Sequence, residues 1–124
     1  MTKKILHFVL FALIIKHCIT DLGIQSHFLW GKTHNKINYF GCHVHYLHHA
    51  IGTFIAFILF TDIKTALLAT VIDYIVHWHV DFTKHNVNTY LGLTRKDKLY
   101  WWTATVDQLL HFLTYYLLVI YIAN

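Results

Sequence analysis

Four apolar stretches constrain this chain to a helical fold, because each is about as long as a helix that crosses a lipid bilayer. The chain has 124 residues, of which 56% are hydrophobic and only 13% charged, and it contains no proline. About 20 apolar residues in a helix span the ~30 Å of membrane hydrocarbon, and proline is the strongest breaker of such helices. We therefore predict one all-α integral-membrane domain over residues 1–124, with transmembrane helices at about 5–29, 43–61, 65–84 and 100–122.

Each apolar stretch carries two side chains that can bind a metal ion, spaced four residues apart. The pairs are His17 and Asp21, His45 and His49, His77 and Asp81, and Asp107 and His111. Residues at i and i+4 lie on one face of a helix, so each helix can direct two ligands at one point. Ionisable groups are costly inside a membrane and are functional-site candidates there. Imidazole together with carboxylate predicts one or two divalent ions, with zinc or iron as the first candidates.

The depth of the four pairs indicates a single site. The first and third pairs fall late in their stretches, whereas the second and fourth fall early. If consecutive helices alternate in direction, all four pairs lie towards the same side of the membrane, next to loops one and three. The sequence therefore predicts an antiparallel four-helix bundle with up-down-up-down topology.

Basic residues near the ends of the stretches predict the orientation in the membrane. Six flank loops one and three, namely Lys32, Lys36, Lys84, Arg95, Lys96 and Lys98, and three flank the other side, namely Lys3, Lys4 and Lys64. Because positive residues are enriched in cytoplasmic loops, we expect loops one and three in the cytoplasm. The net charge of +4 is small and forms no basic stripe. The expected partner is the lipid bilayer and not nucleic acid, and the oligomeric state is not indicated.

Four short motifs follow one another along the chain. They are His17-x3-Asp21 with Gln25, the histidine-bearing segment with His45 and His49, His77-x3-Asp81 with Lys84, and Asp107-Gln108-x2-His111. This order resembles a family of small bacterial and phage membrane proteins known as domain of unknown function 3307. The resemblance implies a helical protein of the bacterial inner membrane with a His/Asp site, and it names no reaction. Extra histidines at His43, His48, His79 and His85 leave open which ligands the second helix supplies.

Metal-bound His/Asp chemistry predicts a membrane metalloenzyme, foremost a hydrolase of a lipid or membrane-proximal substrate. A metal ion with an open coordination position lowers the pKa of bound water and polarises the scissile group. Asp81 and Asp107 are the candidates for a bridging ligand or general base, and Lys84 for holding a phosphate. The alternatives are a dinuclear-iron oxidoreductase, a metal or proton transporter, and a structural membrane protein without catalysis. A transport path should have polar residues along the whole membrane depth, but the half of the membrane depth near the termini is largely apolar. This pattern favours a cup, a site open to one side of the membrane, over a transport path.

Several other polar residues lie close to the predicted site. Asp73 precedes the third pair by one turn, and three interpretations are open: a proton relay, a carboxylate paired with a neighbouring histidine, and a protonated or hydrogen-bonded aspartate between helices. Tyr115 continues the face of the fourth pair and is assigned to packing. For His48 and Thr53, a supporting role at the site and simple packing are both open.

Overall fold

The computed structural model describes residues 3–24 and 40–121, and these residues fold into helices with short connections. The elements are α1 (Lys3–Cys18), the short π-helix η1 (Ile19–Ile24) that continues it, α3 (Phe40–Ile58), α4 (Ile63–Tyr90) and α5 (Lys98–Tyr121). The described ranges contain no strand. The predicted all-α class with four helices is therefore confirmed. The last part of the first predicted span, residues 25–29 with Gln25, lies outside the described residues.

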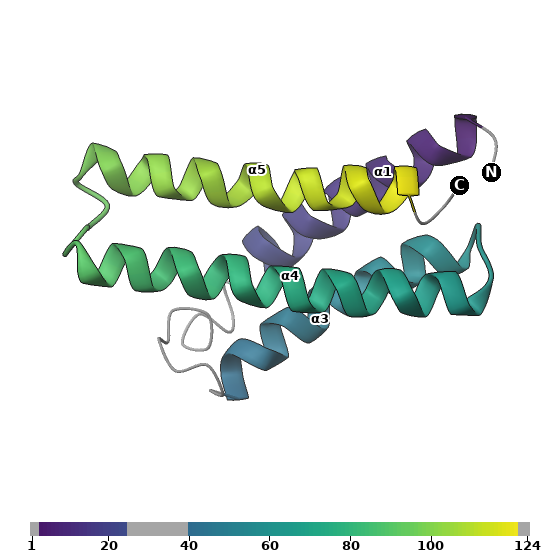
Figure 1. Cartoon of the computed structure of the whole chain (residues 1–124), viewed down its shortest axis with the longest axis horizontal. Helices are drawn as coiled ribbons and strands as arrows, with labels where there is room; N and C mark the ends of the chain where they lie inside the picture. The colour runs from purple at the N-terminus through teal and green to yellow at the C-terminus, as the bar shows by residue number, and fades with distance from the viewer. Residues whose placement is uncertain (1–2, 25–39, 122–124) are drawn as a thin grey trace.

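Consecutive helices run in opposite directions around a closed ring. In Figure 1, α1 and α4 run towards the left, and α3 and α5 run towards the right. α3 packs against α1 and α4, and α5 packs against α4 and α1. The beginning of α3, the end of α4 and the beginning of α5 consequently lie at one end of the bundle, opposite the turn between α3 and α4 (Figure 1).

The connection between α3 and α4 is short, so these helices must be antiparallel neighbours. The amides of Phe60 and Thr61 donate to the carbonyl of Phe57, which closes the end of α3. Asp62 then caps α4, since its carboxylate accepts hydrogen bonds from the amide of Lys64 at 2.9 Å and from that of Thr65 at 3.1 Å. A side-chain oxygen at this position satisfies amides that have no partner within the helix.

α4 continues six residues beyond the predicted end at residue 84 and leaves a shorter connection to α5. Asn86 and Thr89 use their side chains to hydrogen-bond carbonyls one turn earlier, so their polarity does not interrupt the helix. The helix ends at Tyr90, and Gly92 follows it with a φ of 62°, which glycine adopts readily. The amide of Leu93 donates to the carbonyl of Asn88 at 2.8 Å, as in other helix ends of this type.

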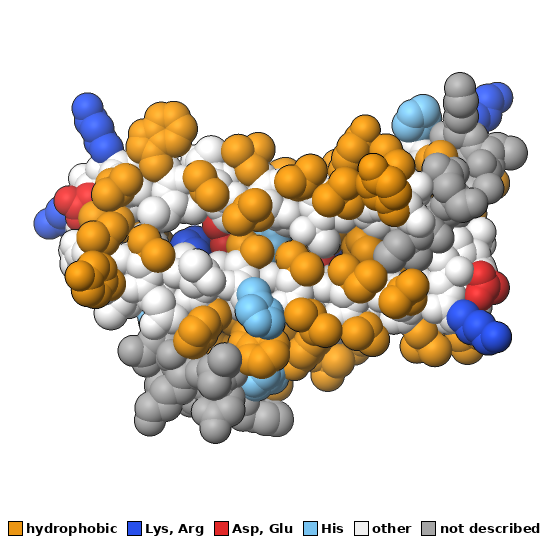
Figure 2. Space-filling model, in the orientation of Figure 1, with side chains coloured by type: hydrophobic (Ala, Val, Ile, Leu, Met, Phe, Trp, Pro, Cys, Tyr) orange, Lys and Arg blue, Asp and Glu red, His pale blue; other side chains and the backbone are white. Residues whose placement is uncertain are grey.

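Side chains of opposite character occupy the two halves of the interior. The half that contains the α3–α4 turn is filled by an apolar cluster that includes Val9, Leu13, Phe57, Ala66, Leu118 and Val119. The other half buries histidines and aspartates. The outer surface carries many exposed hydrophobic side chains over α4 and α5, as Figure 2 shows.

Two segments, Lys4–Gly23 and Lys98–Tyr121, are long and apolar enough to cross a membrane by length and composition. Within the bundle, 22% of the first apolar window and 28% of the second are buried, so most of each faces outward. The other two described helices do not reach this criterion, because α3 carries several histidines and α4 several charged residues. Of the four predicted membrane spans, the first and the fourth therefore meet the criterion of length and composition, and the second and third do not.

Candidate metal centre

The four helices bring all four predicted pairs to one place in the bundle. The eight residues are His17, Asp21, His45, His49, His77, Asp81, Asp107 and His111; seven are buried and the side chain of Asp21 is 9% exposed. The imidazole of His17 lies 5.0 Å, centroid to centroid, from those of His49 and His111. The His77 ring lies 3.8 Å from His49 and 4.0 Å from His111. The polar half of the interior is thus a contiguous group of imidazoles.

Asp21 in η1 reaches three of these imidazoles. Its Oδ1 lies 3.1 Å from Nε2 of His49 and 3.4 Å from Nε2 of His45. Its Oδ2 lies 3.3 Å from Nε2 of His17, one turn earlier. The first helix therefore contributes a carboxylate that faces both histidines of α3.

Asp81 on α4 occupies the corresponding position on the other side of the imidazole group. Its Oδ2 lies 3.4 Å from Nε2 of His45 and 3.5 Å from Nε2 of His77. Its Oδ1 lies 3.2 Å from Nε2 of His111. One carboxylate thus faces histidines from α3, α4 and α5.

The geometry defines two groups of side chains that could hold a metal ion. The first is Asp21, His45, His49 and His77, and the second is His77, Asp81 and His111; within each group the ligand atoms lie within 4.8 Å of one another. Among the described residues, buried ring nitrogens without a hydrogen-bond partner are Nε2 of His45, Nδ1 of His49 and both nitrogens of His77. Leaving such groups unsatisfied is costly, and coordination to a cation would satisfy one nitrogen of each neutral ring.

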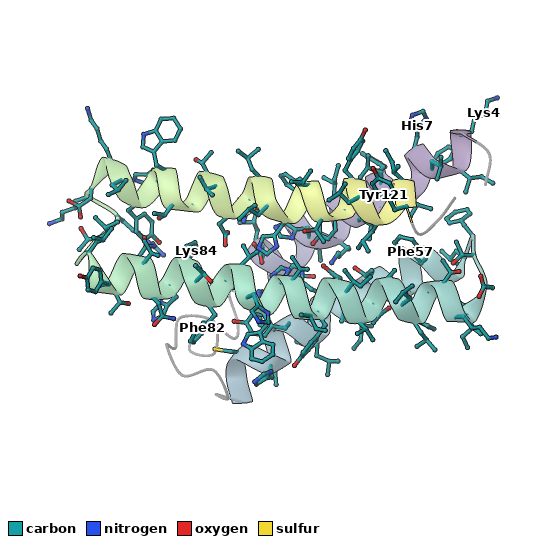
Figure 3. All side chains as sticks on the ribbon, viewed as in Figure 1. Lys4, His7, Phe57, Phe82, Lys84 and Tyr121 are labelled. Atoms are coloured by element: carbon teal, nitrogen blue, oxygen red, sulfur yellow. The ribbon has the colours of Figure 1, made fainter. Side chains whose placement is uncertain are left out.

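Lys84 and Asp107 form an ion pair at the edge of this cluster. The ammonium of Lys84 lies 2.8 Å from Oδ2 of Asp107 and 3.9 Å from Oδ1 of Asp81. The other oxygen of Asp107 lies 3.7 Å from Nε2 of His111 and has no hydrogen-bond partner among the described residues. Lys84 extends from α4 towards α5 (Figure 3). The three catalytic candidates predicted from the sequence therefore lie together: Asp81 and Asp107 belong to the cluster, and Lys84 lies at its edge.

Hydrogen bonds occupy both ring nitrogens of His17. Its Nδ1 lies 2.8 Å from the hydroxyl of Tyr115, and its Nε2 lies 3.0 Å from Oε1 of Gln108. The amide nitrogen of Gln108 in turn donates to Asp21 at 3.3 Å and to Asp107 at 3.1 Å. His17 and Asp107 belong to neither of the two metal-capable groups. Gln108 thereby connects the carboxylates of Asp21 and Asp107 to each other.

Tyr115 was assigned to packing from the sequence, and this interpretation is incomplete. Its ring is buried in the apolar cluster, but its hydroxyl hydrogen-bonds His17 across the bundle. The available sequence signal was its spacing of four residues from His111, which places both side chains on one face of α5. A buried tyrosine hydroxyl normally has a hydrogen-bond partner, and here that partner is a histidine of the cluster.

A buried ion pair lies next to the cluster, one turn towards the apolar half. The ammonium of Lys16 lies 2.7 Å from Oδ2 of Asp73 and donates to the carbonyl of His49 at 3.1 Å. The hydroxyl of Thr53 donates to the same Asp73 oxygen at 2.6 Å. The Lys16 ammonium also lies 4.6 Å from the ring centroid of Tyr115, within range of a cation–π interaction.

The structure identifies side-chain partners of Asp73, whose role the sequence left open. Its partners are Lys16 and Thr53, so it is a hydrogen-bonded aspartate between helices. Gly52 allows this arrangement, because a Cβ there would lie 3.1 Å from Cδ of Lys16, closer than an ordinary contact. The sequence reasoning missed Lys16, whose long apolar stem carries its charge into the bundle from α1.

The structure also separates the histidines of α3. His45 and His49 face the cluster. The additional histidines, His43, His48, His79 and His85, belong to neither metal-capable group. His43 shares a hydrogen bond of 2.7 Å with the hydroxyl of Tyr74, and exposed His79 bonds a carbonyl of its own helix.

The helical bundle and the His/Asp cluster can now be compared with known proteins. The profile of the family described as "Protein of unknown function (DUF3307)" matches residues 9–124, nearly the whole chain. The chain belongs to this family. The resemblance inferred from the ordered motifs is thereby confirmed. None of the curated proteins and none of the solved structures gives a significant match. The family description assigns no activity, so the function must be argued from the site.

Proposed function

We propose that this chain is a multi-pass membrane protein whose His/Asp cluster binds one or two divalent metal ions and hydrolyses a lipid or membrane-proximal substrate. The observation that carries the proposal is the pair of overlapping groups with six ligand-capable residues from all four helices, whose ligand atoms lie within 4.8 Å of one another in each group. Buried clusters of this composition suit transition metals with nitrogen and oxygen ligands.

The distribution of polarity supports a membrane location for the whole bundle. The interior buries ionisable side chains, whereas large apolar side chains are exposed on every helix, including Phe11, Ile55, Val71 and Leu113. A soluble protein normally shows the reverse arrangement. In a bilayer the exposed apolar side chains contact lipid, and ionisable residues face the bundle interior. All four helices then cross the membrane, with the α3–α4 turn on the side opposite the connection between α4 and α5.

Charge balance supports a bound cation. With neutral histidines, Asp21, Asp81 and Asp107 contribute three negative charges and Lys84 contributes one positive charge, which leaves a formal charge of −2 in the cluster. Lys16 does not alter this sum, since Asp73 pairs with it. Uncompensated carboxylates that are close together in a low-dielectric interior destabilise one another. One divalent ion would bring the cluster to zero, and two would bring it to +2.

The residues take distinct roles in this proposal. The two metal-capable groups supply the ligands, and His77 belongs to both. Gln108 holds Asp21 by a hydrogen bond, and such supporting contacts orient ligands and tune their affinity. A bound ion supplies Lewis acidity and an activated water. The free oxygen of Asp107 beside His111 is placed to accept a proton, and Lys84 is placed to hold an anionic group.

The apolar half of the interior supports an enzyme rather than a transporter. Val9, Leu13, Phe57 and Val119 fill the bundle between the cluster and the α3–α4 turn. A translocation path requires polar groups or water along the whole depth of the membrane. Within the described residues, the polar groups end at the Lys16–Asp73 pair and do not continue through this apolar region. The site therefore has the form of a cup.

Metal analysis of the aerobically purified full-length chain, combined with its ultraviolet–visible spectrum, tests the proposal. We expect one or two equivalents of a redox-inactive ion such as zinc and no oxo-bridged iron band. His77→Gln should remove most of the metal, whereas His79→Gln, at an exposed position on the same helix, should not. Full metal content in His77→Gln would refute the site. Bound iron with an oxo-bridged absorption band would refute the hydrolase proposal and favour a dinuclear-iron oxidoreductase.

A further inference from the structure

A groove beside the candidate metal centre runs between the second half of α4 and the first half of α5. Its volume is about 440 Å³. Its apolar walls are formed by Val80, Val87, Leu99, Trp102, Val106 and Leu110. Lys84 and Asp107 also line it, and the space-filling view shows basic and acidic side chains at the bottom of a hollow between these helices (Figure 2). The groove thus combines an apolar channel with one charged end that belongs to the cluster.

The groove opens on the outer surface of the bundle. Trp102 is 66% exposed and Val106 is 52% exposed, so the walls face the surroundings of the protein. The hydroxyl of Thr103, which also lines the groove, lies 2.7 Å from two acceptors, Oδ1 of Asn88 and the carbonyl of Tyr100, so its one proton is already engaged. Among the described residues that line the groove, His79 and Thr83 are the other polar ones and Lys84 is the one lysine, so Lys84 supplies the ammonium group for an anionic ligand.

We propose that this groove binds an acyl chain of an anionic bilayer lipid and that Lys84 holds the phosphate of its headgroup. The inference rests on the proposed function, since it names the class of substrate that the metal centre receives. The acyl chain lies along the apolar walls, and the headgroup lies at the charged end, beside Asp107 and His111. The protein thereby takes its substrate laterally from the membrane.

Charge complementarity selects an anionic headgroup. The Lys84 ammonium has three donors, and a carboxylate oxygen of Asp107 lies 2.8 Å away on one side. Its side chain remains 21% exposed, so a further acceptor can approach it. A lysine contact with phosphate is a charge-assisted hydrogen bond, and basic pockets between membrane helices bind anionic headgroups. With two divalent ions, the cluster including Lys84 would carry a formal charge of +2 at this end of the groove.

A second apolar groove, between α1 and α3, provides an internal comparison. Phe8, Phe11, Ile55 and Leu59 line it, and so does the stem of Lys16. The ammonium of Lys16 is turned inward to Asp73 at 2.7 Å and is not available to a headgroup. This groove can contact lipid chains but has no charged group for a headgroup. The α4–α5 groove combines both features, and its volume lies in the usual range of ligand sites.

Fluorescence quenching of Trp102 by brominated lipids tests the inference. The full-length chain is placed in nanodiscs of phosphatidylcholine that contain a small, fixed fraction of brominated phosphatidylglycerol or, in matched discs, brominated phosphatidylcholine. The difference between the native chain and Trp102→Phe isolates the signal of Trp102. We expect the anionic lipid to occupy the groove with about tenfold preference, the effect of one charge-assisted hydrogen bond. Lys84→Met should abolish this preference, and Lys64→Met, at the opposite end of α4, should retain it.

Three outcomes would overturn the inference. The first is equal quenching by both lipids in the native chain, and the second is an unchanged preference in Lys84→Met. The third is complete loss of the preference on addition of inorganic phosphate, which would show a site for free phosphate. Val106→Phe narrows the groove without altering Lys84 and should lower quenching by either lipid. Unchanged quenching would show that the acyl chain of the lipid does not lie in this groove.

Metal content measured on the same samples separates this inference from the proposed function. Lipid preference in a chain that carries no metal would refute the metalloprotein and the substrate role while leaving a lipid site. Bound metal without lipid preference would refute the lipid inference alone.

Discussion

Replacing either Lys16 or Asp73 alone should destabilise the bundle far more than replacing both. The two side chains come from α1 and α4, and their charged atoms lie 2.7 Å apart. Asp73 is 1% exposed and Lys16 is 10% exposed at its side chain, so water screens neither charge well. Asp73→Asn leaves a buried ammonium without its counter-charge. Lys16→Met leaves a buried carboxylate whose remaining side-chain partner is Thr53.

The expected magnitudes follow from the burial of the pair. Removing one partner of a buried ion pair costs about 3–5 kcal/mol, because the other charge remains desolvated. Removing both charges is often close to neutral. We therefore expect the double variant Lys16→Met/Asp73→Asn to lose about 2 kcal/mol or less. The coupling energy of the cycle should then be about 4 kcal/mol or more, above the ~0.5–3 kcal/mol usual for residues in contact, because both charges are buried.

Reversible unfolding of the full-length chain in mixed micelles provides the four free energies of unfolding for this cycle. All four proteins are measured with and without a chelator, so that loss of metal is not mistaken for loss of the ion pair. Lys64→Met, an exposed lysine at the other end of the bundle, serves as the control and should change stability little. A coupling energy near zero would refute the buried ion pair between Lys16 of α1 and Asp73 of α4.

Three further predictions concern the cluster and the α4 cap. Asp81→Asn should lower bound metal and remove the loss of melting temperature that chelation causes, as metal assays with Asp62→Asn as control can show. Gln108→Leu removes the hydrogen bond to the metal-capable Asp21, and metal titration should show affinity reduced about 10–100-fold, whereas exposed Tyr116→Phe should behave as the native chain. A threonine hydroxyl in the first turn of α4 lowers the pKa of Asp62 below its ordinary 3.8. The cap therefore stabilises the fold above about pH 4 and is lost as the pH falls through the folded pKa; Asp62→Ala should flatten the acid limb of the melting-temperature profile, and an unchanged limb would exclude the cap.

Periodicity alone determined much of the architecture. The four i, i+4 pairs at matching depth predicted antiparallel helices and the convergence of their side chains, because a helix places such residues on one face whatever surrounds it. Separately, the resemblance of the ordered motifs to a known family predicted the family that the profile match confirms. Periodicity missed the end of α4, although the signal at Gly92 was present, because polar residues in the last turns were taken as a loop.

The tertiary structure decided which atoms meet. The sequence offered His17 as a metal ligand, but both of its ring nitrogens are taken by Tyr115 and Gln108, residues more than 90 positions away. It gave no indication that Lys16 would pair with Asp73 across the bundle. Such contacts depend on how each helix is rotated about its axis and how closely it approaches its neighbours. Those quantities are set by packing across the whole bundle, including the absence of a side chain at Gly52, and no local pattern in the sequence contains them.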